Sequence, residues 1–291
     1  MLIGLDHAII AVRDLAQAAD RLGRALGLTV TMGGEHPGMG THNAIARFGT
    51  EYLELISIRH PTEATSHERG RRLADFLKRG EGLLGFALGS DDLDRDVAEA
   101  LERGLYLEGP FPGSRLRPDG TLVRWRTARP PEDPWGRKLP FLIQHSTSLQ
   151  ERRSWVPPQG HQLQVSGIPS VAVAVVDLQT SIEGYRRLLG EPPDSVEDVP
   201  ALPALRARFC VQSLHLDLLQ PTAERGGLAD FLRLQGEGLF LITLAVPDVD
   251  WAVRLLRERG TRVGDPTPRR RAPLLDPSQT LGARFQLAEG Q

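Results

Sequence analysis

Two residues of chemically active type stand inside apolar runs of this 291-residue sequence. His7 lies in the run LDHAIIAV, directly after Asp6, and Glu54 lies within YLELISI. Strand alternation puts Tyr52, Glu54 and Ile56 on one face. Burying a carboxylate is costly unless it is paired or bound to a metal. A neutral imidazole and a carboxylate together suit Zn, Mn, Fe or Ni, and without a metal the imidazole suits proton transfer.

Two further histidines are candidates for a third metal ligand or for a general base. His145 ends the strand-like run LPFLIQHS, and His42 precedes NAIARFG in a glycine-rich stretch. A metal site needs about three protein ligands plus water. A metal-free cleft, in which His7 is the acid or base and Glu54 orients it, is an equal alternative. An exposed strand end for His145 and a loop position for His42 are the plain structural alternatives.

Arginine and tryptophan alternate in the strand-like run TLVRWRTARP, which holds Arg124, Trp125 and Arg126. Arg124 and Arg126 are candidates for binding a ligand carboxylate through the guanidinium group. Trp125 and Tyr52 are candidates for the wall of a substrate cleft, and a solvated strand with one core-facing tryptophan is the alternative. The stretch GGEHPGMG, residues 33–40, lacks the strand–loop–helix order and the lysine of a phosphate-binding loop. It is interpreted as a flap over the cleft.

The elements that must position these residues follow one order four times. The first quarter predicts a strand over residues 5–15, a helix over 15–27 and two strands over 42–49 and 51–58. The order of strand, helix and further strands recurs over 82–146, 168–219 and 238–289. The fold class is therefore α+β. Because one short module cannot bury its own sheet face, we expect the modules to pair around clefts.

A nearly identical sequence segment occurs twice in the chain. LADFLKRGEGLLGFALGSDDLD occupies residues 73–94, and LADFLRLQGEGLFLITLAVPDVD occupies residues 228–250. The pair Asp14-Leu15 also recurs 163 residues later, at Asp177-Leu178. The repeat predicts two tandem domains. The first spans 1–150, with modules at about 1–60 and 80–150, and the second spans 165–291. The polar, Pro-rich segment 151–164 is predicted to link them.

Four segments resemble a known family: LDHAIIAVRDL, GTHNAIARFG, YLELISI and GEGLLGFAL. They are similar to the βαβββ modules of the vicinal oxygen chelate superfamily, which includes glyoxalase I, extradiol dioxygenases, methylmalonyl-CoA epimerase and bleomycin-resistance proteins. The nearest resemblance is to glyoxalase-like domain proteins. It covers nearly the whole chain and implies four βαβββ modules, paired into two glyoxalase/bleomycin-resistance-like domains with curled mixed sheets.

The resemblance also implies chemistry. A divalent metal in the cleft acts as a Lewis acid on vicinal oxygens, in lyase, isomerase or dioxygenase reactions. The fold alone does not choose among these reactions. The family's ligand positions fall on His7 and Glu54 in the first module and on Gly85 and Phe141 in the second. His145 and His42 are not at family positions and remain the candidates for a third ligand or a general base. In the second domain the family positions carry no histidine and indicate a degenerate copy: Ser170, Asp217, Leu241 and Gln286.

The composition bounds the partners of the chain. The formal net charge is −2, which favours neither nucleic acid nor an anionic membrane. No apolar run reaches about 18 residues, so we expect a cytoplasmic protein with no membrane partner. A small-molecule ligand is the expected partner, and a homodimer is left open. The sequence thus predicts a glyoxalase-like protein that binds a small oxygenated metabolite in its first domain. A non-catalytic, ligand-sequestering protein of the bleomycin-resistance kind is the alternative.

Overall fold

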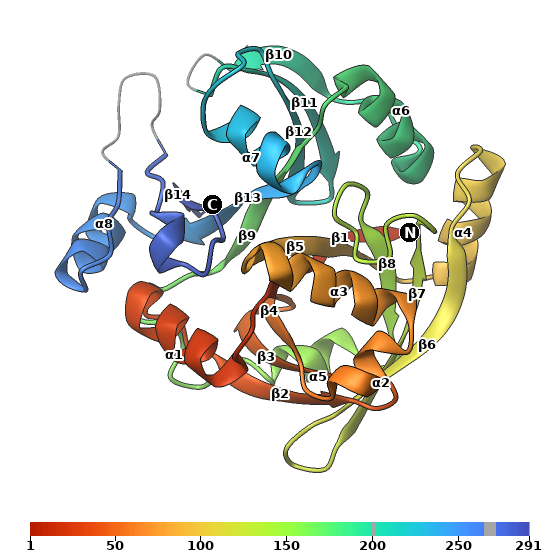
Figure 1. Cartoon of the computed structure of the whole chain (residues 1–291), viewed down its shortest axis with the longest axis horizontal. Coiled ribbons are helices and arrows are strands. Elements are labelled where there is room, and N and C mark those ends of the chain that lie inside the picture. Colours follow the sequence, from red (N-terminus) through yellow and green to blue (C-terminus); the bar gives the residue numbers. More distant parts are fainter. Residues whose placement is uncertain (200–201, 265–271, 291) are drawn as a thin grey trace.

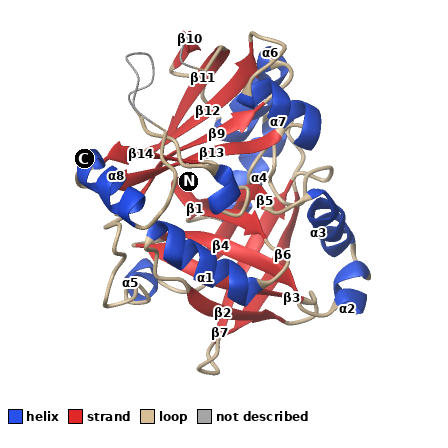
Figure 2. Cartoon of the chain, turned by 60° about the vertical axis from the view of Figure 1, so that its left-hand side comes forward, coloured by secondary structure: helices blue, strands red, loops and turns tan. Residues whose placement is uncertain are grey.

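The chain forms two sheets, one closed and one open (Figures 1 and 2). The computed structural model describes residues 1–199, 202–264 and 272–290. Eight strands close a barrel in the order β1-β4-β3-β2-β6-β7-β8-β5, and six form an open sheet in the order β10-β11-β12-β9-β13-β14. The predicted α+β class, with curled mixed sheets, is confirmed.

The first half of the chain builds the barrel and five helices. Their bounds are β1 (Leu2–Ala11), α1 (Leu15–Leu26), β2 (Thr31–His36), β3 (Thr41–Phe48), β4 (Glu51–Ile58), α2 (Pro61–Thr65), α3 (Glu68–Arg79), β5 (Gly82–Ser90), α4 (Leu93–Glu102), β6 (Glu108–Leu116), β7 (Leu122–Arg129), β8 (Phe141–His145) and α5 (Leu149–Arg153).

The second half of the chain builds the open sheet and its helices. The bounds are β9 (Gly167–Ala174), α6 (Leu178–Leu189), β10 (Ser195–Val199), β11 (Ala204–Val211), β12 (Leu214–Pro221), α7 (Gly227–Gln235), β13 (Gly238–Val246), α8 (Val249–Glu258), a 3₁₀-helix (Pro277–Gln279) and β14 (Phe285–Glu289). No helix among the described residues is both long and apolar enough to cross a membrane.

The repeated sequence signals have structural roles at helix starts. Asp14 caps α1 by accepting a hydrogen bond from the backbone N–H of Gln17, and Asp177 caps α6 in the same way from Thr180. Such a cap stabilises a helix by about 1 kcal/mol. The two long repeated segments also cap helices in this manner: α4 begins at Asp92 and α8 at Asp248, each two residues before the end of its segment.

The repeated Gly-Glu-Gly turn also has one role in both copies. The Oε1 atom of Glu81 accepts a hydrogen bond from the backbone N–H of Arg13 at 2.8 Å. Glu237 accepts one from the backbone N–H of Val176, also at 2.8 Å. In each copy the glutamate thereby ties the chain just after the first strand of one module to the start of the next. The repeated segment therefore preserves the hydrogen bond that connects the two modules of each pair.

One continuous hydrophobic core joins the two sheets. It holds residues such as Ile10 and Leu55 from the outer face of the barrel, together with Val173 and Leu218 from the second sheet. A smaller cluster lies inside the barrel, and another covers the opposite face of the second sheet. The two sheets thus share a core through the faces that are turned away from their own concave sides.

The first half of the glycine-rich stretch 33–40 is part of the barrel wall, so it is not a flap, whereas residues 37–40 form a turn from which Pro37 and Met39 line the cavity. Residues 31–36 form β2, which pairs with β3 and β6. A Cβ atom on Gly34, whose φ is +131°, would lie 1.9 Å from the carbonyl oxygen of Leu116. Glycine therefore lets β6 approach closely enough to close the barrel.

Candidate functional site

The inner face of the barrel encloses a cavity of about 530 Å³. Strand alternation turns His7 of β1, Tyr52 and Glu54 of β4, Trp125 of β7 and His145 of β8 toward it. The first domain therefore gathers most of the residues that the sequence singled out around one space.

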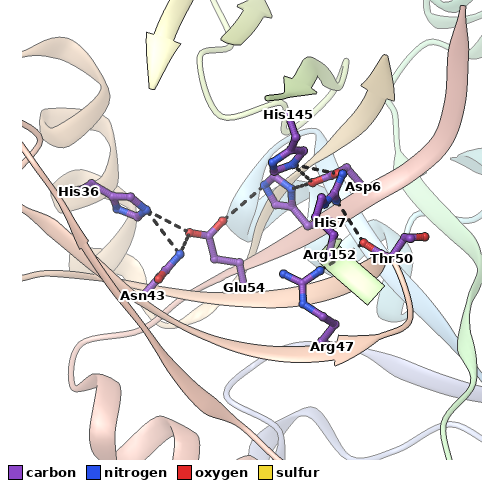
Figure 3. A network of polar contacts seen from close by, with 9 residues as sticks. All are labelled: Asp6, His7, His36, Asn43, Arg47, Thr50, Glu54, His145 and Arg152. Carbon is purple, nitrogen blue, oxygen red and sulfur yellow. Dashed lines mark hydrogen bonds and ion pairs between the residues drawn. The ribbon is translucent and has the colours of Figure 1, made fainter. Parts of the chain in front are cut away.

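Asp6 and His7 form a buried pair at the cavity wall (Figure 3). The Nδ1 atom of His7 lies 2.8 Å from Oδ1 of Asp6, and its Nε2 atom lies 3.4 Å from Oε2 of Glu54. Neighbouring strand residues normally point to opposite faces, but β1 shifts register between Leu5 and His7. This bulge turns Asp6 to the side of His7. Hydrogen bonding to Asp6 puts the imidazole proton on Nδ1 and leaves Nε2 facing Glu54.

Asp6 has two further partners, and both come from distant parts of the chain. The Nε2 atom of His145 lies 3.1 Å from Oδ2 of Asp6, and Nη2 of Arg152 donates to the same oxygen. Burial alone would raise the pKa of Asp6. The charges of His145 and Arg152, with hydrogen bonds from His145 and His7, outweigh burial and hold this pKa well below its ordinary value. Asp6 is therefore a permanent anion at neutral pH.

Glu54 is held from the other side by two residues that the sequence reading missed. Asn43 donates from Nδ2 to Oε1 of Glu54 at 2.7 Å, and Nε2 of His36 lies 3.8 Å from the same oxygen. Burial opposes ionisation of Glu54, but electrostatic interaction with His7 and His36 and the Asn43 hydrogen bond lower its pKa overall. Burial also lowers the pKa of His36 to about 4. At neutral pH the site thus holds an ionised Glu54 beside a neutral His36.

The residues at the family's ligand positions do not fit a metal. No group of three or more His, Cys, Asp or Glu side chains in the described part of the chain is placed to hold an ion. At Gly85 a Cβ atom would lie 2.0 Å from the carbonyl oxygen of Trp135, so no ligand side chain has room there. The ring of Phe141 lies edge-on to His7, with 5.6 Å between centroids. Only His7 and Glu54 remain as donors at those positions.

The two histidines considered as third ligands lie elsewhere. His145 lines the cavity, but its Nε2 atom is directed at Asp6, and its Nδ1 atom is buried without a hydrogen-bond partner. His42 neighbours Asn43 on β3, and Asn43 points inward to Glu54, so alternation turns His42 to the outer face. His42 is not among the residues that line the cavity.

Among the arginines that line the cavity, Arg47 and Arg115 are buried and Arg69 is half-buried. None of these three lies within 4 Å of a carboxylate among the described residues. Arg47 stacks over Tyr52 with 4.6 Å from its guanidinium carbon to the ring centroid, and Arg69 stacks over Trp135 at 4.1 Å. Burial lowers the pKa of both Arg47 and Arg69 to about 10 and also lowers that of Arg115. The cavity wall is therefore cationic.

The predicted arginines on β7 lie at the edge of the site or outside it. Arg124 is exposed and borders the cavity, whereas Arg126 is absent from its lining. Arg126 pairs with Asp94 at 2.9 Å and donates to Oε1 of Gln144 at 2.6 Å. As expected from alternation, Trp125 points inward between them. The alternating arginines beside Trp125 therefore predicted this strand correctly, but they did not identify the arginines that lie deep in the cavity.

The segment predicted to be a linker contributes to the site. Arg152 lies on α5, and Trp155 lines the cavity just beyond it. The polar, Pro-rich composition did not predict that Arg152 and Trp155 contribute to the site, because neither residue belongs to a recognisable sequence motif. The barrel site is thus completed by residues after position 150.

Comparisons with known proteins place this architecture. The family model described as "Glyoxalase-like domain" matches residues 5–189. The chain belongs to the glyoxalase-like domain family. A second model, for the glyoxalase/bleomycin resistance protein/dioxygenase superfamily, matches residues 167–274 of this glyoxalase-like protein. The tandem relationship predicted from the repeat is confirmed. No curated protein matched the chain.

Several solved structures resemble this glyoxalase-like protein. A hypothetical protein from Staphylococcus aureus is 13% identical with a TM-score of 0.69, covering 98% of this chain and 99% of its own. A mutant of 4-hydroxymandelate synthase from Streptomyces coelicolor is 17% identical with a TM-score of 0.67, covering 100% and 94%. Methylmalonyl-CoA epimerase from Mycobacterium tuberculosis is 26% identical over 45% of this chain and 91% of its own, with a TM-score of 0.41. The first two similarities establish the fold.

Proposed function

We propose that this glyoxalase-like protein binds a small oxygenated organic anion in the barrel cavity and moves a proton on it, with His7 as the acid–base group. One observation carries the proposal: the Asp6–His7 pair faces a cavity whose buried arginines lack carboxylate partners among the described residues. The anion supplies the missing counter-charge, and the histidine supplies the chemistry.

The charge of the cavity supports an anionic ligand. A guanidinium removed from water without a counter-ion is costly, and the buried Arg47 and Arg115 and the half-buried Arg69 all line this space. Glu54 is the one carboxylate among the described lining residues. Two other lining arginines are left out of the balance, because Arg124 is exposed at the rim and Arg129 pairs with Glu108 at 3.7 Å. The three guanidinium groups without a carboxylate partner, set against Glu54, leave two positive charges in excess. A dicarboxylate, or an acid with a second anionic oxygen, balances this excess through the bidentate geometry that arginine favours.

The arrangement around His7 supports proton transfer at a carbon next to a carbonyl group. Nε2 of His7 takes the proton: the C–H bond breaks, an N–H bond forms, and the electron pair moves onto the carbonyl oxygen as an enolate. The guanidinium groups stabilise the enolate oxygen. Asp6 fixes the imidazole tautomer, and Glu54, 3.4 Å from Nε2, stabilises the imidazolium that forms. Return of the proton to another position or face completes an isomerisation.

A second candidate function is ligand sequestration without turnover. Two features favour it. Gly85 and Phe141 stand at positions where the vicinal oxygen chelate superfamily has metal ligands, and the cavity has an aromatic lining. In this case the same arginines bind the anion, and His7 serves only to complete the wall.

Deuterium exchange separates the two functions. We expect wild-type protein in D₂O to exchange the α-protons of a 2-oxo dicarboxylic acid, followed by ¹H NMR. His7→Gln should slow exchange by at least about 100-fold while changing affinity only a few-fold. Arg69→Met should weaken binding by about 10-fold or more, because it removes a half-buried charge.

Matched measurements define the other outcomes. Arg124→Met removes an exposed arginine at the rim and should alter binding little. Tight binding with no exchange supports sequestration. Equal binding of the dicarboxylate by wild type and Arg69→Met, or no binding of any anion, contradicts the proposal. Elemental analysis of the purified protein, with exchange measured before and after chelation, reports any dependence on a metal.

A further inference from the structure

A second cavity of about 720 Å³ lies against the open sheet. Its walls are the concave faces of β9, β12, β13 and β14, together with the segment that holds Leu274 and Leu275. It shares no lining residue with the barrel cavity. The proton-transfer proposal for the first domain makes no use of it.

Strand register makes this cavity the counterpart of the barrel site. His7 pairs with Tyr52 in the barrel, and Ser170 pairs with His215 in the second sheet, so Ser170 occupies the place of His7. The same comparison sets Asp217 in the place of Glu54. On the other side of each sheet, Ala87 pairs with Phe141 and Thr243 pairs with Gln286. The second copy has therefore changed all four positions.

Three of these positions form a polar chain that the barrel lacks. Nε2 of Gln286 donates to Oγ1 of Thr243 at 2.7 Å, and the hydroxyl groups of Thr243 and Ser170 lie 2.6 Å apart. All three side chains line the cavity. Here the replacements satisfy one another and present hydroxyl groups to the cavity.

The charged residues of the cavity are paired, with one exception. Arg208 binds Asp217 through two hydrogen bonds of 2.7 and 2.8 Å, Arg206 binds Glu197 at 2.5 Å, and Arg262 binds Asp276 at 2.6 Å. Arg284 has neither a carboxylate nor a hydrogen-bond acceptor among the described residues. Its guanidinium carbon instead lies over the rings of Phe231 and Phe240, at 5.2 and 4.9 Å.

Arg284 directly precedes β14 and lines the cavity together with Gln286. The two residues are separated by Phe285, which is fully buried in the core on the other side. Burial lowers the pKa of Arg284, with no charged partner contributing to the shift. One positive charge therefore remains uncompensated in a half-buried position, where a single anionic group of a ligand fits.

The rest of the lining is largely apolar. A register shift in β13 between Leu239 and Leu241 allows the neighbouring side chains of Phe240 and Leu241 both to face the cavity. Leu202, Leu219 and Leu274 extend this surface. We propose that the second domain has a ligand site of its own, which takes a small organic acid with one carboxylate and an apolar body. Arg284 binds the carboxylate, and the Ser170–Thr243–Gln286 chain contacts its oxygens or a neighbouring polar group.

Calorimetric titration of the full chain tests this site with 3-phenylpropionate and with its uncharged amide. We expect the acid to bind with one molecule per chain, and the amide to bind about 10-fold or more weakly. Arg284→Met should reduce affinity for the acid by a similar factor, and circular dichroism should show an unchanged fold. Thr243→Val keeps the side-chain shape, breaks the polar chain and should weaken binding by several-fold.

The outcomes are separated by a variant of the other cavity. Arg69→Met should leave binding of 3-phenylpropionate unchanged, since Arg69 lies in the barrel. Loss of binding in Arg69→Met with full binding in Arg284→Met would place the acid in the barrel and overturn the proposal. Equal affinities for acid and amide, or no saturable binding at millimolar concentrations, also overturn it. If Arg284→Met does not fold, Thr243→Val and the acid–amide comparison decide the question. The function proposed for the barrel is tested separately, because its assay follows a dicarboxylate and compares wild type with His7→Gln.

Discussion

At the scale of single residues, Asp6 organises the barrel site. It contacts His7, His145 and Arg152, which come from the first strand, the last barrel strand and the segment after the barrel. The Asp6 and Arg152 side chains are almost completely buried. An ion pair in such surroundings adds little compared with apolar packing, but the loss of one partner leaves a stranded charge. Because Asp6 also contacts His7, a change to the Asp6–Arg152 pair should affect both the orientation of the His7 ring and the stability of the folded protein.

Removing one partner of this pair should be more harmful than removing both. We expect Asp6→Asn to lower the free energy of unfolding by about 3–5 kcal/mol, because Arg152 is left buried without its counter-ion. The double variant Asp6→Asn/Arg152→Met should recover part of this loss. Urea unfolding of the four proteins in the cycle measures it. A single variant as stable as wild type would show that the pair is not a buried constraint.

His36 makes stability depend on pH in the acidic range. Its pKa is about 4 in the folded protein, below the ordinary value of 6.5. Between these values the unfolded chain binds a proton that the native chain does not, so stability falls as pH drops from 6.5 toward 4. At about 1.4 kcal/mol per pH unit, the contribution of His36 is about 3 kcal/mol.

The variant His36→Gln should therefore lose less stability than wild type between neutral and acidic pH. Urea unfolding midpoints across that range provide the measurement. His215→Gln is the matched control, because it replaces a histidine that is exposed on β12. Parallel pH curves for wild type and His36→Gln would disprove the assignment.

At the scale of elements, the sequence predicts those side-chain directions that follow from regular strand alternation. Alternation in β4 correctly turns Tyr52 and Glu54 to the cavity. Asp6 also faces the site, but only because of a bulge, which residue spacing does not reveal. The strand β6, EGPFPGSRL, has two prolines and two glycines and so lacks a strand signature, although it carries Arg115 into the cavity. Sites built from irregular elements were missed for this reason.

The joint between β4 and β9 provides an opposite pH effect. Oε2 of Glu51, the first residue of β4, accepts a hydrogen bond from the backbone N–H of Ile168 at 2.6 Å. Burial raises the pKa of Glu51 from 4.5 to about 7, and this hydrogen bond only partly opposes it. The native carboxyl group therefore holds a proton that the unfolded chain has lost. Its stabilising contribution is complete below pH 4.5 and is lost as pH rises through about 7.

Glu51→Gln should consequently be more stable than wild type on the alkaline side and similar to it on the acidic side. The difference should approach, at most, about 3 kcal/mol, because the pKa of Glu51 rises from 4.5 to about 7 on folding. Chemical unfolding at both ends of this range measures the difference. Glu68→Gln, which alters an exposed carboxylate on α3, serves as the control. A stability difference that does not change with pH would contradict the role given to Glu51.

At the scale of the whole molecule, the two sheets are separate in their cavities but joined in their core. The outer face of the barrel and the second sheet share one cluster of buried residues. Polar contacts support this junction: Arg103 donates to the backbone oxygen of Arg187 at 2.7 Å, and Thr261 donates to that of Ala25 at 2.7 Å. Duplication has thus produced two ligand-sized spaces that depend on one shared interior.

Dividing the chain should therefore lower the stability of the barrel even where the repeat suggests a boundary. A fragment of residues 1–150 loses Arg152, which strands the Asp6 charge, and exposes the shared core. A fragment of residues 1–164 restores Arg152 and also His161, whose Nε2 donates to the backbone oxygen of Arg47 at 2.8 Å. We expect neither fragment to reach the thermal midpoint of the full chain, and the shorter one to be the less stable. Near-ultraviolet circular dichroism melts and sedimentation compare them. If residues 1–150 alone unfold sharply at the full-chain midpoint, the second sheet is dispensable for the barrel, and the shared core does not govern its stability.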